Sequence, residues 1–354
     1  MIPLSRLTRN LAAATALALL GLAGCQTAAV DPAPAQRLNE AERTAERQAA
    51  PIPLRRWTPI RVMAQAVPLS APAYEGSGPV RFAGGIHLTS PSIELGGISD
   101  LALTDDRRFL AITDEGFWLR GELVLDRTGR LTGVRNVAVR PLLDAEGRAL
   151  ALQDKSVSDS EGLAIADDGS ALVSFEREHR IWRYDLRTGR SLGAAAMPDV
   201  ELPLNDGLEG LTFAHGAVWA GGEAGGLWRC TNACEQIAPP PAVVPVDSDQ
   251  RVTALSPEPD GDRLFVLTRA WDEAARRNTM EVTLRAPSAF NQPHTPLIRL
   301  EPPATVDNFE GLSARPRAGG VRLYISSDDN YSPHQRTLIL AFDVDQAAMA
   351  APSN

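Results

Sequence analysis

The sequence predicts an all-β fold, a β-propeller of five or six blades, and two observations carry this prediction. First, five segments share one pattern: a short apolar strand, a polar turn, a second apolar strand and then a charged residue. They begin at Gly97, Asp159, Asp206, Val252 and Asn308. Repeats of about 40–50 residues with four strands each are typical of propellers. Second, the 28 Gly and 27 Pro residues favour turns over long helices.

The repeats predict one propeller domain over residues 75–346, followed by a short tail, residues 347–354. Five blades come from the five repeats. A sixth blade could be assembled from residues 80–88 and the last apolar strand, residues 337–344, which would close the ring. A parallel α/β fold is disfavoured because no amphipathic helices alternate with these strands.

Composition and charge exclude several classes of protein. The chain has 354 residues, of which 44% are hydrophobic, so it can bury a substantial core and is not disordered as a whole. It carries 35 basic and 44 acidic residues, a formal charge of -9. A nucleic-acid partner is excluded on this balance, because such proteins need a basic surface. We expect a monomer.

Residues 1–24 have the features of an export signal. Arg6 and Arg9 precede an apolar run at residues 11–22, which is too short to span a bilayer comfortably. The run ends in LAGC, which resembles the lipobox of bacterial lipoproteins. The resemblance implies that Cys25 is lipidated and that the protein is anchored in the bacterial cell envelope by this lipid alone, facing the periplasm or the cell surface. The alternative is an ordinary secretory signal with an incidental cysteine.

Residues 25–74 are predicted to be the lipidated cysteine and a flexible tether, because this region is rich in Ala, Pro, Gln, Glu and Arg. Residues 38–50 could form a short helix, but they contain too few apolar residues to pack.

The other two cysteines, Cys230 and Cys234, flank a tight turn. In an oxidising compartment they can form a disulfide that joins the two strands of a hairpin. The competing interpretation is half of a zinc site, for which no second Cys or His pair stands nearby.

The repeats place charged residues at two equivalent positions. The innermost strands of a propeller converge on a central channel, so equivalent residues form rings. The first ring contains Glu161, Glu209 and Glu310, each followed by Gly-Leu, with Ser99 and either Arg251 or Val252 in the other units. The second ring contains Asp114, Glu176, Glu223 and Asp328, with Arg269 in the remaining unit.

Seven carboxylates in one channel would repel one another unless a cation compensates. Carboxylate oxygens suit Ca²⁺ or Mg²⁺ better than zinc, and we expect Ca²⁺. The alternative is that these acids cap strand ends by accepting backbone N–H groups. Arg177 and Arg269 lie close to the rings in sequence, where they could pair with the acids, bind an anionic substrate or simply face solvent.

Several of these segments resemble the phytase-like family known for the esterase-like activity of phytase. They read GGISDLAL, ITDEG, DSEGLAIADDGSALVSFE, NDGLEGLTF and NFEGLS, and the resemblance covers most of residues 80–345. It implies an exported, calcium-dependent propeller with phosphoesterase or esterase chemistry. The fourth unit departs from the family, which usually has Glu-Arg where Thr268-Arg269 stands here. Thr253 and Ala254 stand where a glutamate is expected, so one acidic corner is missing.

The sequence therefore favours a Ca²⁺-dependent hydrolase that acts on a small anionic phosphoester or ester. One of Glu161, Glu209 or Glu310 would be the general base, and Arg177 or Arg269 would bind the anion. Two alternatives remain open. One is a non-catalytic envelope protein that binds a ligand or partner on the propeller face, and the other is a lactonase-type enzyme.

Overall fold

The computed structural model describes residues 39–350, apart from residues 51, 55, 244 and 247–248. The chain divides into two units, and every described residue belongs to the second, Pro34–Asn354. The predicted signal peptide and Cys25 lie outside the described residues and stay predictions. Within the described ranges, no helix is long and apolar enough to cross a membrane.

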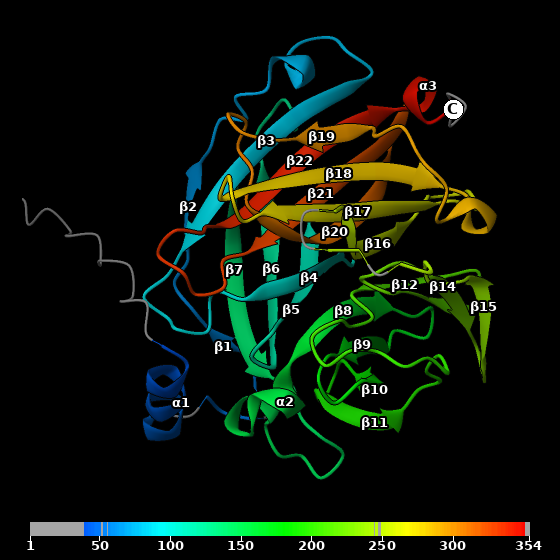
Figure 1. Cartoon of the computed structure of the whole chain (residues 1–354). Coiled ribbons are helices and arrows are strands. Elements are labelled where there is room, and N and C mark those ends of the chain that lie inside the picture. Colours follow the sequence, from blue (N-terminus) through cyan, green and yellow to red (C-terminus); the bar gives the residue numbers. More distant parts are fainter. Residues whose placement is uncertain (1–38, 51, 55, 244, 247–248, 351–354) are drawn as a thin grey trace, which may run out of the picture. The chain divides into compact units, whose positions relative to one another are not determined.

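The strands of the second unit form five antiparallel sheets, and each sheet is one blade (Figure 1). Blade 1 contains β4 (Ile98–Leu103), β5 (Arg108–Thr113), β6 (Phe117–Leu125), β7 (Leu131–Pro141) and the short β1 (Thr58–Pro59). Blade 2 contains β8 (Ser160–Ile165), β9 (Ala171–Phe175), β10 (Arg180–Asp185) and β11 (Arg190–Ala194). Blade 3 contains β12 (Gly210–Ala214), β13 (Ala217–Gly221), β14 (Leu227–Cys230) and β15 (Cys234–Ala238).

Blades 4 and 5 complete the set. Blade 4 contains β16 (Arg251–Pro257), β17 (Leu264–Asp272), β18 (Arg277–Arg285) and β19 (Ile298–Leu300). Blade 5 contains β20 (Asn308–Arg317), β21 (Gly320–Asp328), β22 (Thr337–Asp345), β3 (Val80–Thr89) and β2 (Met63–Ala66). The propeller prediction is confirmed with five blades, and the proposed sixth blade is wrong. β22 pairs with β21 on one side and with β3 on the other, so both predicted strands of a sixth blade belong to blade 5.

The first strands of the five blades meet around a common axis. β4 contacts β8 and β20, β12 contacts β8 and β16, and β16 contacts β20, which closes the circle. Apolar side chains fill the spaces between neighbouring blades. Ile112 of β5, for example, shares one buried cluster with Leu163 and Val173 of blade 2. Because a blade buries both of its faces, a strand such as β9 is buried along its length, and the burial of apolar side chains is the main stabilising contribution to the fold.

The predicted tether differs from the structure in residues 40–66. Helix α1 (Glu40–Ala49) packs on blade 1, and β1 and β2 join blades 1 and 5. Arg43 and Arg47 of α1 both form ion pairs with the buried Glu115, and Arg43 stacks 3.9 Å from the ring centre of Tyr331. The sequence of residues 38–50 predicts a helix with too few apolar residues to pack. In the structure, the long aliphatic stems of the arginines and their ion pairs hold the helix against the propeller instead. Of the whole helix, Arg47 is the buried residue.

Short helices lie between some of the strands, and one more follows the last strand. They are α2 (Lys155–Ser158), α3 (Gln346–Met349), η1 (Pro72–Tyr74), η2 (Leu150–Leu152) and η3 (Pro287–Ala289). The structure also joins Cys230 to Cys234 through a disulfide, across the hairpin of β14 and β15.

Candidate acidic site on the propeller axis

The Glu-Gly pairs of the first ring lie at irregularities in the innermost strands. The pairing of β8 with β9 shifts between Ser160 and Leu163, and that of β20 with β21 shifts between Phe309 and Gly311. Glu161 and Glu310 therefore stand outside the regular ladder, as bulged residues whose side chains are re-aimed. Glu209 occupies a comparable place, directly before the first residue of β12.

The glycine after Glu161 allows neighbouring innermost strands to approach closely. A Cβ added at Gly162 would lie 2.6 Å from the Cβ of Leu211 and 2.7 Å from the carbonyl oxygen of Glu209, both in blade 3. No larger residue fits at this position, so the Glu-Gly pair places a carboxylate at the axis where two blades touch.

Blades 1 and 4 carry no acid at this position. In blade 1 the bulged residue is Ser99, as predicted. In blade 4 the shift lies between Val252 and Ala254, so Thr253 takes the place that was predicted for Arg251 or Val252. The assignment to Arg251 or Val252 was wrong, whereas Thr253 is one of the two residues that the family resemblance places where a glutamate is expected. The Thr253 hydroxyl donates to the backbone carbonyl of Phe309 and has a structural partner.

The second ring is built by equivalent backbone pairing in all five blades. Glu176 donates its N–H to the carbonyl of Asp159, and Glu223 and Asp114 donate theirs to Gly207 and Gly97. In blades 4 and 5 the same position is filled by Arg269, paired with Arg251, and by Asp328, paired with Asn308. The structure therefore places all five predicted residues of this ring at equivalent positions.

All seven predicted carboxyl groups have raised pKa values. Burial is the largest cause in each case, and neighbouring acids add to it. Glu161 and Glu209 have pKa values well above the ordinary range, because burial is reinforced by other carboxylates. Burial and the nearby acids raise the pKa of Glu176 and of Glu223 to about 7. Without a cation, these acids therefore keep their protons to a higher pH than free carboxyl groups do.

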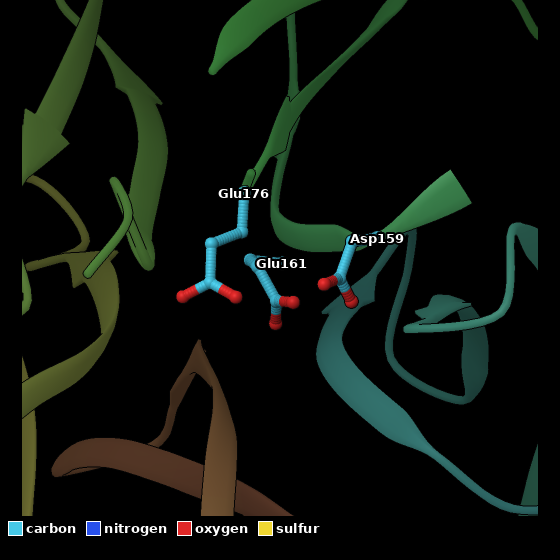
Figure 2. Close-up of side chains that lie close together, drawn as sticks. All are labelled: Asp159, Glu161 and Glu176. Carbon is cyan, nitrogen blue, oxygen red and sulfur yellow. The ribbon is translucent and has the colours of Figure 1, made fainter. Parts of the chain in front are cut away.

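Two groups of three carboxylates lie close enough to hold a metal ion. Within each group the carboxylate oxygens lie within 4.8 Å of one another. The groups are Asp159, Glu161 and Glu176, and Glu176, Glu209 and Glu223. Figure 2 shows the side chains of the first group pointing into one shared space. Glu176 belongs to both groups and connects them.

Four cationic side chains surround these acids. Lys155 Nζ lies 2.7 Å from both Asp114 Oδ2 and Asp159 Oδ1. Arg177 Nε lies 2.6 Å from Asp159 Oδ2, so this predicted anion-binding residue is engaged with an acid. Arg251 bridges Asp206 and Glu223. Arg269 Nη2 is 3.6 Å from Glu310 Oε1, too far for a hydrogen bond.

Sequence reasoning missed Asp159, Asp206 and Lys155. Asp159 is a potential ligand, Asp206 accepts from Arg251, and Lys155 pairs with two acids at once. One signal could have found the first two: an aspartate stands two or three residues before each Glu-Gly pair, as in DSEG, DGLEG and DNFEG. No comparable signal identifies Lys155, which lies in the connection before blade 2.

The ring acids make a pH dependence that can be tested. Glu176, Glu223 and Glu310 have an ordinary pKa of 4.5 and a pKa of about 7 in the folded chain. Between these values the folded chain binds more protons than the unfolded chain, so the free energy of unfolding is expected to fall as the pH rises. Urea unfolding in EDTA at several pH values from about 4.5 to about 7.5 measures how the free energy of unfolding depends on pH. A free energy that rises across this window would contradict the expectation.

Comparison with known proteins identifies a family. A family model described as Phytase-like, esterase-like activity of phytase, matches residues 93–331. No curated protein matches this chain.

Solved structures similar to this chain have low sequence identity. A gluconolactonase from Xanthomonas campestris is 12% identical, with a TM-score of 0.42, over 82% of this chain and 99% of that protein. The PQQ-bound aldose sugar dehydrogenase from Streptomyces coelicolor is 15% identical, with a TM-score of 0.41, over 81% of this chain and 99% of that protein. The Dos1 propeller is 12% identical, with a TM-score of 0.34, over 77% of this chain and 70% of that chain. The family match, which spans more than half of the sequence, decides the assignment: this chain belongs to the phytase-like family.

Proposed function

We propose that the protein is a Ca²⁺-dependent hydrolase of phosphoric or carboxylic esters that acts at the axis of the propeller. The observation that carries this proposal is the pair of three-carboxylate groups that share Glu176. Membership of the phytase-like family supports it, since the family is described by an esterase-like activity.

The donor set fits Ca²⁺. This ion takes about six to eight oxygen ligands and accepts carboxylates in one- or two-oxygen modes. The two groups offer only carboxylates, and their raised pKa values reflect burial and mutual repulsion, which a divalent cation would relieve. When bound, Ca²⁺ would act as a Lewis acid toward the phosphoryl or carbonyl oxygen of the ester.

Glu310 is the best candidate for the general base. It belongs to neither three-carboxylate group, and burial raises its pKa to about 7, near the value at which a base works best in neutral solution. Asn308 Nδ2 donates to Glu310 Oε1 over 2.6 Å, which orients the carboxylate. No described residue donates a hydrogen bond to Oε2, so this oxygen is available to a water molecule.

Glu310 can both accept and return the one proton that the hydrolysis moves. Glu310 would take a proton from the attacking water, whose oxygen bonds to the phosphorus or carbonyl carbon. The bond to the ester oxygen then breaks, and the leaving alcohol takes the proton from Glu310. Arg269, 3.6 Å from Glu310, would pair with the anionic part of the ester.

Metal removal tests the proposal. Purified protein is assayed against phosphate monoesters, carboxylic esters and lactones in EDTA, and then with Ca²⁺, Mg²⁺ or Mn²⁺ restored. We expect hydrolysis of at least one class of ester to fall by about a hundredfold or more in EDTA and to return with Ca²⁺.

Other outcomes would overturn the proposal. If no ester is hydrolysed with any of these ions, the ligand- or partner-binding hypothesis replaces it. Hydrolysis confined to lactones would favour a lactonase-type enzyme, and ester hydrolysis that persists in EDTA would remove the metal from the mechanism.

A further inference from the structure

One of the cations on the propeller axis is the ammonium group of Lys155. This residue begins α2, in the connection before blade 2, and its side chain is 18% exposed. Lys155 is also the only lysine in the sequence, because all the other basic residues among the 35 are arginines. The chain therefore places its one compact ammonium charge, rather than a planar guanidinium, beside the axial acids.

Three oxygen atoms surround this ammonium group at short range. Lys155 Nζ donates to the backbone carbonyl oxygen of Asp114 at 2.6 Å and to Asp114 Oδ2 at 2.7 Å. It also lies 2.7 Å from Oδ1 of Asp159, one of the carboxylates drawn in Figure 2. Carboxylate and backbone carbonyl oxygens are the donors that hold Ca²⁺ in proteins, at about 2.3–2.6 Å. The ammonium group thus occupies a position that has the ligands of a metal site.

A fourth oxygen atom at this position is unused. Asp114 Oδ1 is buried and has no hydrogen-bond partner among the described residues. An ammonium group has three protons to donate, and Lys155 already has three oxygen atoms within reach. A Ca²⁺ ion has no such limit and can take both oxygens of one carboxylate. The position therefore offers more oxygen atoms than the lysine uses.

Groups other than Lys155 also hold the two acids in place. The N–H of Asp114 donates to the carbonyl oxygen of Gly97 at 2.9 Å. Arg177 Nε lies 2.6 Å from Oδ2 of Asp159, on the carboxylate oxygen that Lys155 does not contact. Shortening the side chain of Lys155 should therefore leave both carboxylates close to their present positions.

We propose that Lys155 is a tethered cation that fills a third metal position on the axis and keeps Ca²⁺ out of it. A chain without this ammonium group would accept one more ion, between Asp114 and Asp159. Asp114 follows β5 of blade 1 and Asp159 precedes β8 of blade 2, so the tethered cation joins two blades even when Ca²⁺ is absent. The inference goes beyond the proposed function, because it requires no hydrolysis.

Two variants with the same change of charge test the inference. Lys155→Ala removes the ammonium group and leaves its space open, whereas Lys155→Met removes the charge but fills the space with an apolar side chain of similar length. Metal-free protein is titrated with Ca²⁺ by calorimetry, and bound calcium is counted by elemental analysis after dialysis. We expect Lys155→Ala to bind one more Ca²⁺ per chain than the wild type, and Lys155→Met to bind the same number as the wild type.

Thermal unfolding provides a second readout for the same variants. In EDTA both should melt about 3 °C or more below the wild type, because two acids lose the cation between them. Saturating Ca²⁺ should remove this difference for Lys155→Ala and leave it for Lys155→Met. An additional ion in both variants, or in neither, would overturn the inference.

The wild type allows a third measurement, because Lys155 is its only lysine. The chain is treated with the N-hydroxysuccinimide ester of acetic acid, and acetylation of the peptide that contains Lys155 is followed by mass spectrometry. We expect acetylation in the folded chain to be about tenfold or more slower than in urea, both with and without Ca²⁺. Acetylation that accelerates in saturating Ca²⁺ would mean that the ion displaces the ammonium group, and would also overturn the inference.

These results can be separated from the proposed function. If the wild type binds no Ca²⁺ but Lys155→Ala binds one ion, the inference stands and the Ca²⁺-dependent hydrolase fails. If the wild type hydrolyses esters with Ca²⁺ while Lys155→Ala gains no ion, the hydrolase stands and the inference fails.

Discussion

Replacing Glu176 by glutamine is expected to weaken Ca²⁺ binding by about a hundredfold or more and to abolish most metal-dependent hydrolysis. Glu176 is the carboxylate that both three-carboxylate groups share, so its loss removes a ligand from each. Glutamine keeps the size of the side chain but removes its charge and one of its carboxylate oxygens. Calcium titration by calorimetry and ester assays at saturating Ca²⁺ measure the two effects.

A second measurement separates this loss from simple unfolding. Burial and the nearby acids hold the pKa of Glu176 at about 7, so its charge is unfavourable in the metal-free channel at higher pH. The Glu176→Gln protein in EDTA is therefore expected to be at least as stable as the wild type near pH 8.

The matched control is Glu178→Gln, an exposed acid two residues along the chain. It should bind Ca²⁺ and hydrolyse esters as the wild type does. Unchanged Ca²⁺ affinity in Glu176→Gln would show that the shared group does not hold the ion, and the site proposed on the axis would have to be abandoned.

The propeller could be predicted from the sequence because its period is local. Each repeat carries its own pair of apolar strands and a turn, as in the segment from Asp159 to Glu176 that becomes β8 and β9. The number of blades was harder to predict. Blade 5 is closed by pairing β3, near the start of the domain, with β22 at its end, and no local pattern shows a pairing between such distant strands.

The residues of the two rings could be predicted because they recur in each repeat. The residues that contact the rings from outside the repeats could not. Glu161, Glu209 and Glu310 recur in Glu-Gly pairs that the contact between blades requires, so alignment of the repeats finds them. Lys155 comes from a connection found in one blade alone and has no equivalent to align with. The packing of α1 depends on the ion pair between Arg47 and Glu115. These residues lie far apart in the sequence, so no local pattern predicts that they pair.

The largest effect on stability is expected from Asp100→Ala. Asp100 lies in β4, is 1% exposed and was not singled out by the repeats. Its carboxylate accepts hydrogen bonds from backbone N–H groups in three different strands. The donors are Leu101 of β4 itself at 2.7 Å, Leu163 of blade 2 at 2.8 Å and Leu312 of blade 5 at 3.4 Å. One side chain thus connects the innermost strands of three blades.

Alanine would leave these buried donors without an acceptor, and each such donor costs about 1–3 kcal/mol. We expect the free energy of unfolding to fall by about 3–5 kcal/mol, measured by urea denaturation. Asp100→Asn keeps one acceptor oxygen but turns an amide group toward one of the donors, so it should lie between alanine and the wild type. Asp106→Ala, in the exposed turn that follows β4, is the control and should change stability by less than about 0.5 kcal/mol. A loss below about 1 kcal/mol in Asp100→Ala would mean that the buried carboxylate adds little to the closure of the blades.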